Sequence, residues 1–121
     1  MKGYLGLEKQ TKETLQDGWL CTNDLGYLDE EGFLYLTDRK KNLIITGAAN
    51  VFPSMVENVL DEHENVLEVA VVGVPHPDWD EAVVAVVIVK DKKAFDADEM
   101  IAFCKTSMAT FEVPKHIVLV D

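Results

Sequence analysis

Two side chains of opposite charge, Asp24 and Arg39, are the first residues of this sequence that could bind a polar ligand. Asp24 lies in the segment Thr22-Asn23-Asp24-Leu25-Gly26, and its carboxylate offers two acceptor oxygens. Arg39 is the only arginine of the chain, and its guanidinium is planar and permanently charged. Each also has an ordinary interpretation, as a turn aspartate and as a solvated charge in the run Arg39-Lys40-Lys41.

Metal chemistry is not indicated. Cys21 and Cys104 are far apart, and His63, His76 and His116 occur singly, so no metal-ligand spacing is present. The sequence therefore predicts no metal site.

Composition and charge limit the classes of protein and partner. The 121 residues are 48% hydrophobic, which suits one small domain, or one such domain with a tail from a neighbour. The net charge is -11, which argues against nucleic acid or an anionic membrane as a partner. No signal-peptide run opens the chain, and the longest apolar stretch, Ala82 to Val89, is too short to span a membrane. We expect a cytoplasmic protein.

Residues 1–40 alternate short apolar runs with turn signals, which predicts a β-meander. The turn Asp29-Glu30-Glu31-Gly32 ends in a glycine, and Phe33, Tyr35 and Thr37 alternate with their neighbours as in a strand. A β-hairpin is therefore expected around this turn.

Beyond Arg39-Lys40-Lys41 the pattern changes. We expect a strand at Leu43-Ile44-Ile45, a loop at Thr46–Asn50 and a helix opened by Pro53. The apolar face of that helix should comprise Met55, Val56, Val59 and Leu60. Residues 66–74 and 81–89 are rich in Val, Ile and Ala, which predicts strands covered on both faces.

A second helix should begin at Asp96, with Glu99 completing a capping box. Its core face should comprise Met100, Phe103, Cys104 and Met108. A last strand is expected at 116–120. The order β-α-β-β-α-β predicts an α+β fold with a small mixed β-sheet and two or more helices, preceded by the hairpin or meander.

Several motifs in fixed order resemble the adenylate-forming superfamily, and within it the C-terminal region of AMP-forming acyl-CoA synthetases. They are Gly18-Trp19, Thr22-Asn23-Asp24-Leu25-Gly26, Asp29 to Gly32, Asp38-Arg39-Lys40-Lys41, Ile44-Ile45-Thr46-Gly47 and Asn50-Val51-Phe52-Pro53. Peptide-synthetase adenylation domains and luciferases belong to the same superfamily. The resemblance extends over almost the whole chain, from Met1 to Lys115.

The resemblance implies a reaction in two steps. Such enzymes join a carboxylic acid to ATP as an acyl-adenylate and then form a thioester with CoA, while a small domain rotates between the steps. It also implies that residues 1–40 are terminal strands of a large N-terminal domain, and that residues 41–121 are most of the mobile C-terminal domain. The implied partners are that missing domain, a small carboxylic acid and CoA, with ATP/AMP as nucleotide and Mg²⁺ arriving with the ATP.

The resemblance assigns roles to three residues of the nucleotide site and hinge. Asp24 corresponds to the aspartate that binds the AMP ribose hydroxyls, and Arg39 to the arginine that reaches the ribose and phosphate. Lys41 corresponds to the hinge about which the domain turns. Asn23 replaces the usual glycine before the aspartate, and asparagine tolerates the left-handed conformation.

A second set of residues corresponds to the acceptor tunnel and the CoA contacts: Gly47, Ala48, Ala49, Asn50, Trp79, Phe111 and Lys115. Relatives have Gly-Gly-Glu-Asn where this chain has Gly47-Ala48-Ala49-Asn50, and Val113 replaces a basic residue before the proline. Trp79 has an equally good interpretation as an aromatic lid on the end of the sheet. Acids alone occupy the charged positions between Lys41 and Lys90, which should attract CoA phosphates weakly.

The catalytic lysine of the family would lie beyond Asp121, so the isolated chain should be inactive and holds no catalytic residue of its own. Two alternatives remain open. One keeps adenylate formation but ends at acyl-AMP or loads a carrier protein. The other is a non-enzymatic interaction module.

Overall fold

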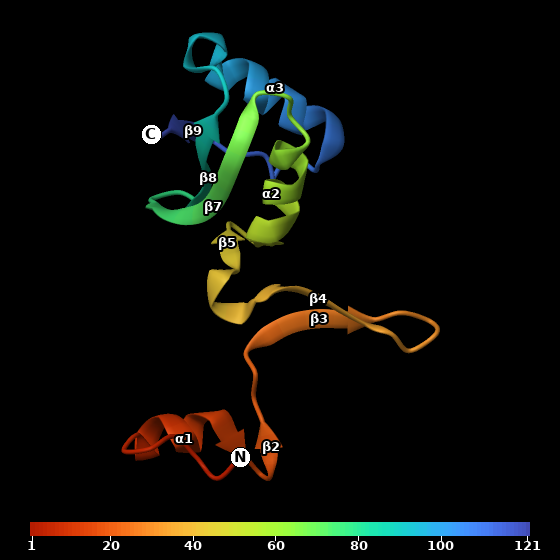
Figure 1. Ribbon diagram of the computed structural model, residues 1–121, viewed down its shortest axis with the longest axis vertical. Helices are drawn as coiled ribbons and strands as arrows, with labels where there is room; N and C mark the ends of the chain where they lie inside the picture. The colour runs from red at the N-terminus through yellow and green to blue at the C-terminus, as the bar shows by residue number, and fades with distance from the viewer.

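The computed structural model describes all 121 residues, which form an elongated molecule of two unequal parts (Figure 1). The N-terminal part comprises α1 (Glu8–Thr14), β1 (Leu15–Gln16), β2 (Trp19–Leu20), β3 (Asp24–Leu28) and β4 (Leu34–Arg39). A 3-10 turn, η1 (Lys40–Asn42), leads to the second part. That part comprises β5 (Ile44–Thr46), β6 (Ala49–Val51), α2 (Pro53–Asp61), β7 (Val66–His76), β8 (Asp80–Val89), η2 (Lys92–Ala94), α3 (Ala97–Ser107) and β9 (His116–Leu119).

The C-terminal part is an α+β domain around a mixed five-stranded sheet. The sheet order is β6-β5-β8-β7, and β9 pairs with β8 as well. Most neighbours are antiparallel, but β9 lies parallel to β8 with Val84 opposite His116. The helices α2 and α3 contact each other beside the sheet (Figure 1). The predicted fold class and the hairpin around Asp29–Gly32 are confirmed.

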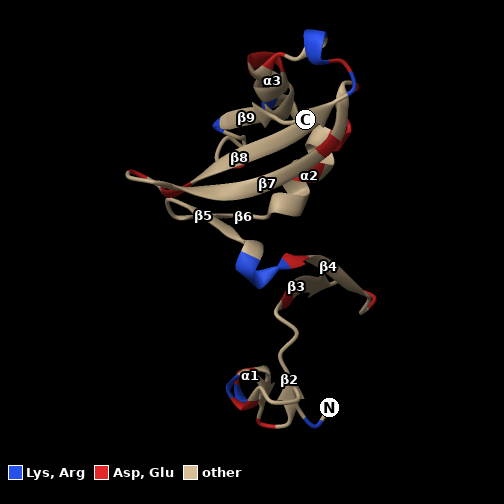
Figure 2. Ribbon diagram, turned by 60° about the vertical axis from the view of Figure 1, so that its left-hand side comes forward, with Lys and Arg blue, Asp and Glu red and all other residues tan.

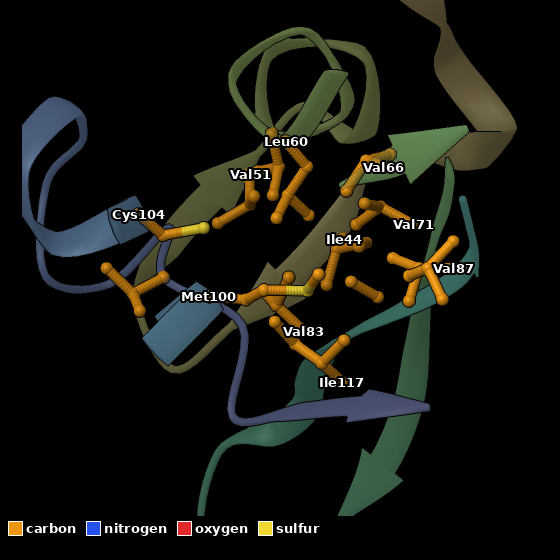
Figure 3. Packing of buried hydrophobic residues seen from close by; sticks show 14 residues of the cluster. Ile44, Val51, Leu60, Val66, Val71, Val83, Val87, Met100, Cys104 and Ile117 are labelled. Carbon is orange, nitrogen blue, oxygen red and sulfur yellow. The ribbon is translucent and has the colours of Figure 1, made fainter. Parts of the chain in front are cut away.

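The hydrophobic core belongs to the C-terminal part alone. Its fourteen buried residues all lie between Ile44 and Ile117. Figure 3 shows Leu60 of α2, Met100 and Cys104 of α3 and Val83 and Val87 of β8 converging on one centre. By contrast, Trp19, Leu34 and Leu36 of the N-terminal part are largely exposed. The two parts therefore differ in how much of their stability they can supply themselves.

The helix α1 was not expected, because the sequence predicted a meander from the first residue. None of its residues is buried. Its residues Glu8 to Thr14 are polar and include good helix formers, and Thr11 accepts a hydrogen bond from the Tyr4 backbone N–H. Local propensity and this contact favour a short helix where no sheet partner is available.

The strands β7 and β8 differ in burial, which corrects the prediction that both are covered on both faces. Four consecutive residues of β8, Ala82 to Ala85, are each below one tenth exposed, so both faces of this strand are covered. In β7 the side chains of Val72 and Val74 face outward and are exposed, because β7 is an edge strand and the two helices lie on the other face of the sheet.

Both predicted helices of this part are confirmed, with small differences. Pro53 occupies the first turn of α2, and Val56 and Leu60 are buried, but Met55 is exposed. Asp96 caps α3 by accepting hydrogen bonds from the backbone N–H groups of Asp98 and Glu99. Thr46–Asn50 is the closed end of the β5–β6 hairpin rather than a free loop, with Thr46 paired to Ala49 across the two-residue turn Gly47-Ala48.

Candidate functional site

Asp24 and Arg39 meet at the open end of the β3–β4 hairpin. Asp24 begins β3 and Arg39 ends β4, and the two residues are direct partners in the antiparallel register. The Nε of Arg39 lies 3.0 Å from the Oδ1 of Asp24. Asn23, which precedes Asp24, has φ of +61°, the left-handed conformation expected of this residue. The hairpin thus joins two predicted site residues that are fifteen positions apart.

The far end of this hairpin is a tightly bonded turn. Asp29 accepts hydrogen bonds from the backbone N–H groups of Phe33 and Glu31, and the first of these is the main reason that the pKa of Asp29 lies below its ordinary value. Gly26 is needed in β3 because a Cβ there would lie 2.5 Å from the carbonyl oxygen of Tyr35. These features fix the turn side of the hairpin, and a register shift between Leu25 and Gly26 then places Asp24 opposite Arg39.

A cleft of about 830 Å³ lies beside the Asp24–Arg39 pair, between α1 and η1. Three cations, Arg39, Lys40 and Lys41, line one side of it, and Thr22 and Asn23 contribute polar groups. Figure 2 shows these positive charges together at the junction of the two parts. The cleft can therefore accept an anionic ligand, although the whole chain is acidic.

Asp38, which the sequence did not single out, joins the hairpin to α2. Its Oδ2 accepts a hydrogen bond of 3.1 Å from the backbone N–H of Ser54, and its Oδ1 accepts one of 2.7 Å from that of Arg39. Burial by itself would raise the pKa of Asp38, but the hydrogen bonds from Ser54 and Arg39 outweigh it and lower the pKa. Asp38 is therefore ionised at neutral pH.

Lys41 lies in η1, between the last strand of the hairpin and the first strand of the sheet. Its side chain is exposed, and no hydrogen bond or ion pair of its side chain occurs in the structure. The position links two elements without packing against either, which is the setting of a residue that can change its backbone dihedrals.

Gly47, Trp79 and Lys115 come together at the end of the sheet. Gly47 opens the two-residue turn between β5 and β6 with φ of +59°, and its backbone N–H donates a hydrogen bond of 2.7 Å to the carbonyl oxygen of Trp79. The Nζ of Lys115 lies 5.1 Å from the Trp79 ring centroid, within cation–π range. His76 stacks on the same indole at 4.2 Å.

Glu81, which the sequence analysis also missed, holds β5 in place. Its Oε2 accepts a hydrogen bond of 2.8 Å from the backbone N–H of Ile45. Gly73 on the neighbouring strand leaves room for this carboxylate, since a Cβ there would lie 2.7 Å from Oε1. Because the contact joins residues 36 positions apart, no local sequence signal could have revealed it.

The remaining predicted residues are not gathered into this group. Asn50 lies opposite Ile45 within the β5–β6 pair, and Ala48 and Ala49 occupy the rest of that hairpin end. Phe111 is exposed in the connection between α3 and β9, and no aromatic contact joins it to Trp79.

Comparison with known proteins places this geometry in a family. The sequence profile of the AMP-binding enzyme C-terminal domain matches residues 55–121, which is more than half of the chain. The chain belongs to this family. It is also 42% identical over 119 residues to a 2-succinylbenzoate–CoA ligase of Listeria monocytogenes, and 46% identical over 115 residues to a long-chain-fatty-acid–CoA ligase of Bacillus subtilis.

These matches cover 98% and 95% of this chain but only 25% and 20% of the two ligases, so the chain spans about a quarter of their length. Among solved structures, the o-succinylbenzoate CoA synthetase of Bacillus subtilis in complex with the acyl-adenylate intermediate OSB-AMP is similar over 100% of this chain and 25% of its own. The TM-score is 0.92 at 38% identity. The resemblance to AMP-forming acyl-CoA ligases is thereby confirmed.

Membership of the AMP-binding C-terminal domain family relates the fold to larger ligases that use ATP and CoA. The structure has no helix long and apolar enough to cross a membrane. It also has no group of three His, Cys, Asp or Glu side chains arranged for a metal ion.

Proposed function

We propose that this chain is the C-terminal region of an AMP-forming acyl-CoA ligase. The observation that carries the proposal is the Asp24–Arg39 pair beside a cationic cleft, in a chain that belongs to the AMP-binding C-terminal domain family. The whole ligase joins a carboxylic acid to ATP, releasing pyrophosphate, and then transfers the acyl group from AMP to the CoA thiol. The acid is of the fatty-acyl or aryl class.

Residues 1–40 belong, on this proposal, to the large N-terminal domain, and residues 41–121 form the mobile domain. The distribution of the core supports this division, because residues 1–43 contribute nothing to the buried cluster. The exposed side chains of Trp19, Leu34 and Leu36 are apolar surface that further protein would cover.

The Asp24–Arg39 pair suits the ribose and phosphate of AMP. The contact from Arg39 uses Nε and the Oδ1 of Asp24, so Oδ2 and the two terminal nitrogens of the guanidinium remain for a ligand. A carboxylate oxygen accepts hydrogen bonds from ribose hydroxyls, and the fork of guanidinium donors suits phosphate. On this proposal, Mg²⁺ enters the enzyme with the phosphates of ATP.

Lys41 is the hinge of the proposed rotation. The segment Lys40–Asn42 is a short 3-10 turn with no buried residue, and a few such positions can absorb a large change of φ and ψ. Rotation about Lys41 would move the Gly47–Trp79–Lys115 group, while the Asp24–Arg39 pair stays with the large domain.

The Gly47–Trp79–Lys115 group is the proposed acceptor site, with Ala48, Ala49 and Asn50 lining the thiol tunnel and Phe111 at its border. Trp79 offers an aromatic ring for the adenine of CoA, and Lys115 offers a cation for its phosphates. The backbone N–H of Gly47 donates to the carbonyl oxygen of Trp79, so the turn lies next to the backbone that carries the indole, and its small residues suit the close approach of a thin pantetheine arm.

A second acceptor is favoured by one observation. Eight acids and no lysine or arginine occur between Lys41 and Lys90, which disfavours the phosphates of free CoA and keeps open a carrier-protein phosphopantetheine or an end at acyl-AMP. A non-enzymatic interaction module is the remaining alternative.

The catalytic lysine is not among these residues, so the isolated chain should not form adenylates. We place the whole enzyme in the cytoplasm, where the free thiols of Cys21 and Cys104 stay reduced.

The test uses the full-length ligase with its carboxylic acid, ATP and either CoA or a phosphopantetheine carrier protein. We expect pyrophosphate release and a CoA thioester, with Trp79→Ala raising the KM for CoA at least tenfold and Leu67→Ala, at an exposed apolar position of β7, leaving it unchanged. A thioester formed only on the carrier protein would move the acceptor assignment to the alternative. An absence of ATP-dependent adenylate would overturn the proposed function.

A further inference from the structure

Only two hydrogen bonds join residues 1–40 to residues 44–121, and both involve Ser54. The backbone N–H of Ser54 donates to the Oδ2 of Asp38 at 3.1 Å. Its hydroxyl Oγ donates to the carbonyl oxygen of Thr37 at 2.7 Å. The other contacts at the junction are local to the turn around η1, such as Asn42 to Asp38 and Leu43 to Lys40. We refer to the two hydrogen bonds as the Ser54 contacts.

In the Ser54 contacts, acceptor groups outside α2 bind hydrogen-bond donors at the start of this helix. Ser54 is the second residue of α2, and the first N–H groups of a helix have no partner inside it. Phe52 precedes the helix and supplies no side-chain cap. Asp38 takes this place from 16 residues away, and its negative charge lies at the positive end of the helix dipole.

The junction contains neither an ion pair nor a shared hydrophobic core. No ion pair crosses it, and the core cluster contains no residue before Ile44. Of the regular elements, β4 and α2 make the main contact across it. The orientation of the sheet domain relative to the hairpin therefore depends on the segment around Lys41 and on the Ser54 contacts.

We propose that Asp38 and Ser54 are positioning residues that hold the C-terminal domain in the adenylate-forming orientation, and that rotation about Lys41 requires the Ser54 contacts to break. A MatB structure with ATP bound, from Rhodopseudomonas palustris, matches 99% of this chain at a TM-score of 0.91 and 38% identity. The match includes both sides of the junction, and ATP is the substrate of the adenylate-forming step. The role in catalysis rests on the proposed function, but the structural part of the proposal does not.

The strength expected of the Ser54 contacts suits bonds that break and re-form during domain rotation rather than a permanent link between the two parts. A hydrogen bond to a charged group changes an equilibrium by roughly tenfold to a hundredfold, and one between neutral groups by up to about tenfold. Two such bonds can hold one orientation as the major population and still open on the millisecond timescale of domain motion. Removing Asp38 should therefore shift the ratio of the two orientations by at least about tenfold.

The structural test measures residual dipolar couplings of backbone amides in the 121-residue chain. In the wild type we expect the couplings of β3–β4 and of β7–β8 to fit one alignment tensor. In the double variant Asp38→Ala/Ser54→Ala they should need two tensors, while the chemical shifts of β7 and β8 stay unchanged. Asp61→Ala, at the exposed end of α2, is the control and should behave as the wild type.

A single tensor in the double variant would overturn the proposal, and so would two independent tensors in the wild type. Ser54→Ala alone removes the hydroxyl but keeps the backbone N–H that donates to Asp38. Its β3–β4 couplings should therefore depart from the alignment tensor of β7–β8 by less than those of the double variant do. This single variant decides the question if the double variant does not fold.

The functional test compares two rates in the full-length ligase. We expect Asp38→Ala to slow pyrophosphate release at least tenfold and to leave thioester formation from supplied acyl-adenylate unchanged or faster. If Asp38→Ala slowed both rates equally, Asp38 would only stabilise the fold, and the positioning role would be refuted. If the wild-type ligase forms no acyl-adenylate, the proposed function fails, and the dipolar couplings alone decide whether the Ser54 contacts fix the orientation.

Discussion

The guanidinium Nε of Arg39 lies 3.0 Å from the Oδ1 of Asp24, directly across the β3–β4 ladder. The carboxylate is mostly shielded, with 28% of its side chain exposed, while the arginine is 64% exposed. The aspartate is thus fixed by the strand, and the arginine retains freedom to turn towards a ligand. This asymmetry fits a site in which Asp24 orients the ribose and Arg39 follows the phosphate.

Replacing either member of this pair should weaken nucleotide binding by the full-length ligase. A charge-assisted hydrogen bond contributes about 1.5–3 kcal/mol, so Asp24→Asn should raise the Kd for AMP about tenfold to a hundredfold. Arg39→Lys should do the same, because the fork of donors is lost although the charge remains. Calorimetric titration with AMP measures both. Lys9→Gln, in exposed α1, should bind AMP as the wild type does, and an equal loss there would point to a general charge effect.

Gly47→Ala should destabilise the C-terminal part by about 1 kcal/mol. Gly47 has φ of +59°, and a Cβ there would meet no atom within 4 Å, so the cost is backbone strain alone. The free energy of unfolding in urea is the measurement. Ala48→Gly is the matched control one position later, where φ is not positive, and it should not gain stability. An unchanged Gly47→Ala variant would contradict the assigned turn.

Asp80→Gly should stabilise the protein by up to about 1 kcal/mol. Asp80 has φ of +62°, a conformation that is strained for a residue with a Cβ, and the gain is partly offset by the entropy of glycine in the unfolded chain. Thermal unfolding followed by circular dichroism tests this. Asp78→Gly removes the same charge from the same turn without relieving a positive φ, and its melting temperature should not rise.

Acidification should remove the stabilising contribution of Asp38. Its folded pKa lies below the ordinary value of 3.8, so the folded state binds its proton less readily than the unfolded state does. The contribution is complete above pH 3.8 and is lost as the pH falls from there through the folded pKa. Unfolding in urea between pH 7 and pH 3 should show a shallower loss for Asp38→Asn than for the wild type. Identical pH profiles would exclude Asp38 as a contributor.

Amide hydrogen exchange should divide the chain at η1. The backbone of β8 pairs on both sides and lies in the core, so its amides should exchange only on global unfolding. The β3–β4 hairpin contributes no core residue, and its amides should exchange many-fold faster. Equal protection in both segments would mean that the hairpin folds as one unit with the sheet.

The sequence predicted most of the elements because their signals are local. Pro53 and the apolar spacing of Val56 and Leu60 mark α2, Asp96 marks the start of α3, and the turn ending in Gly32 marks the hairpin. The helix α1 was missed because its residues are polar and bury nothing, so the helical period of apolar residues is absent. The exposure of β7 was missed because a run of Val residues does not reveal which strand lies at an edge.

By itself, the sequence determined the α+β class, the family and the residue types of the site, since these follow from local periodicity and from motifs in fixed order. The tertiary structure alone decided which of these residues meet. It brought the backbone N–H of Gly47 to the carbonyl oxygen of Trp79 and the Nζ of Lys115 to the Trp79 ring, and it placed Asp38 at the start of α2 through Ser54. Such contacts depend on strand register and on how helices pack against a sheet, and neither is encoded within a short window of sequence.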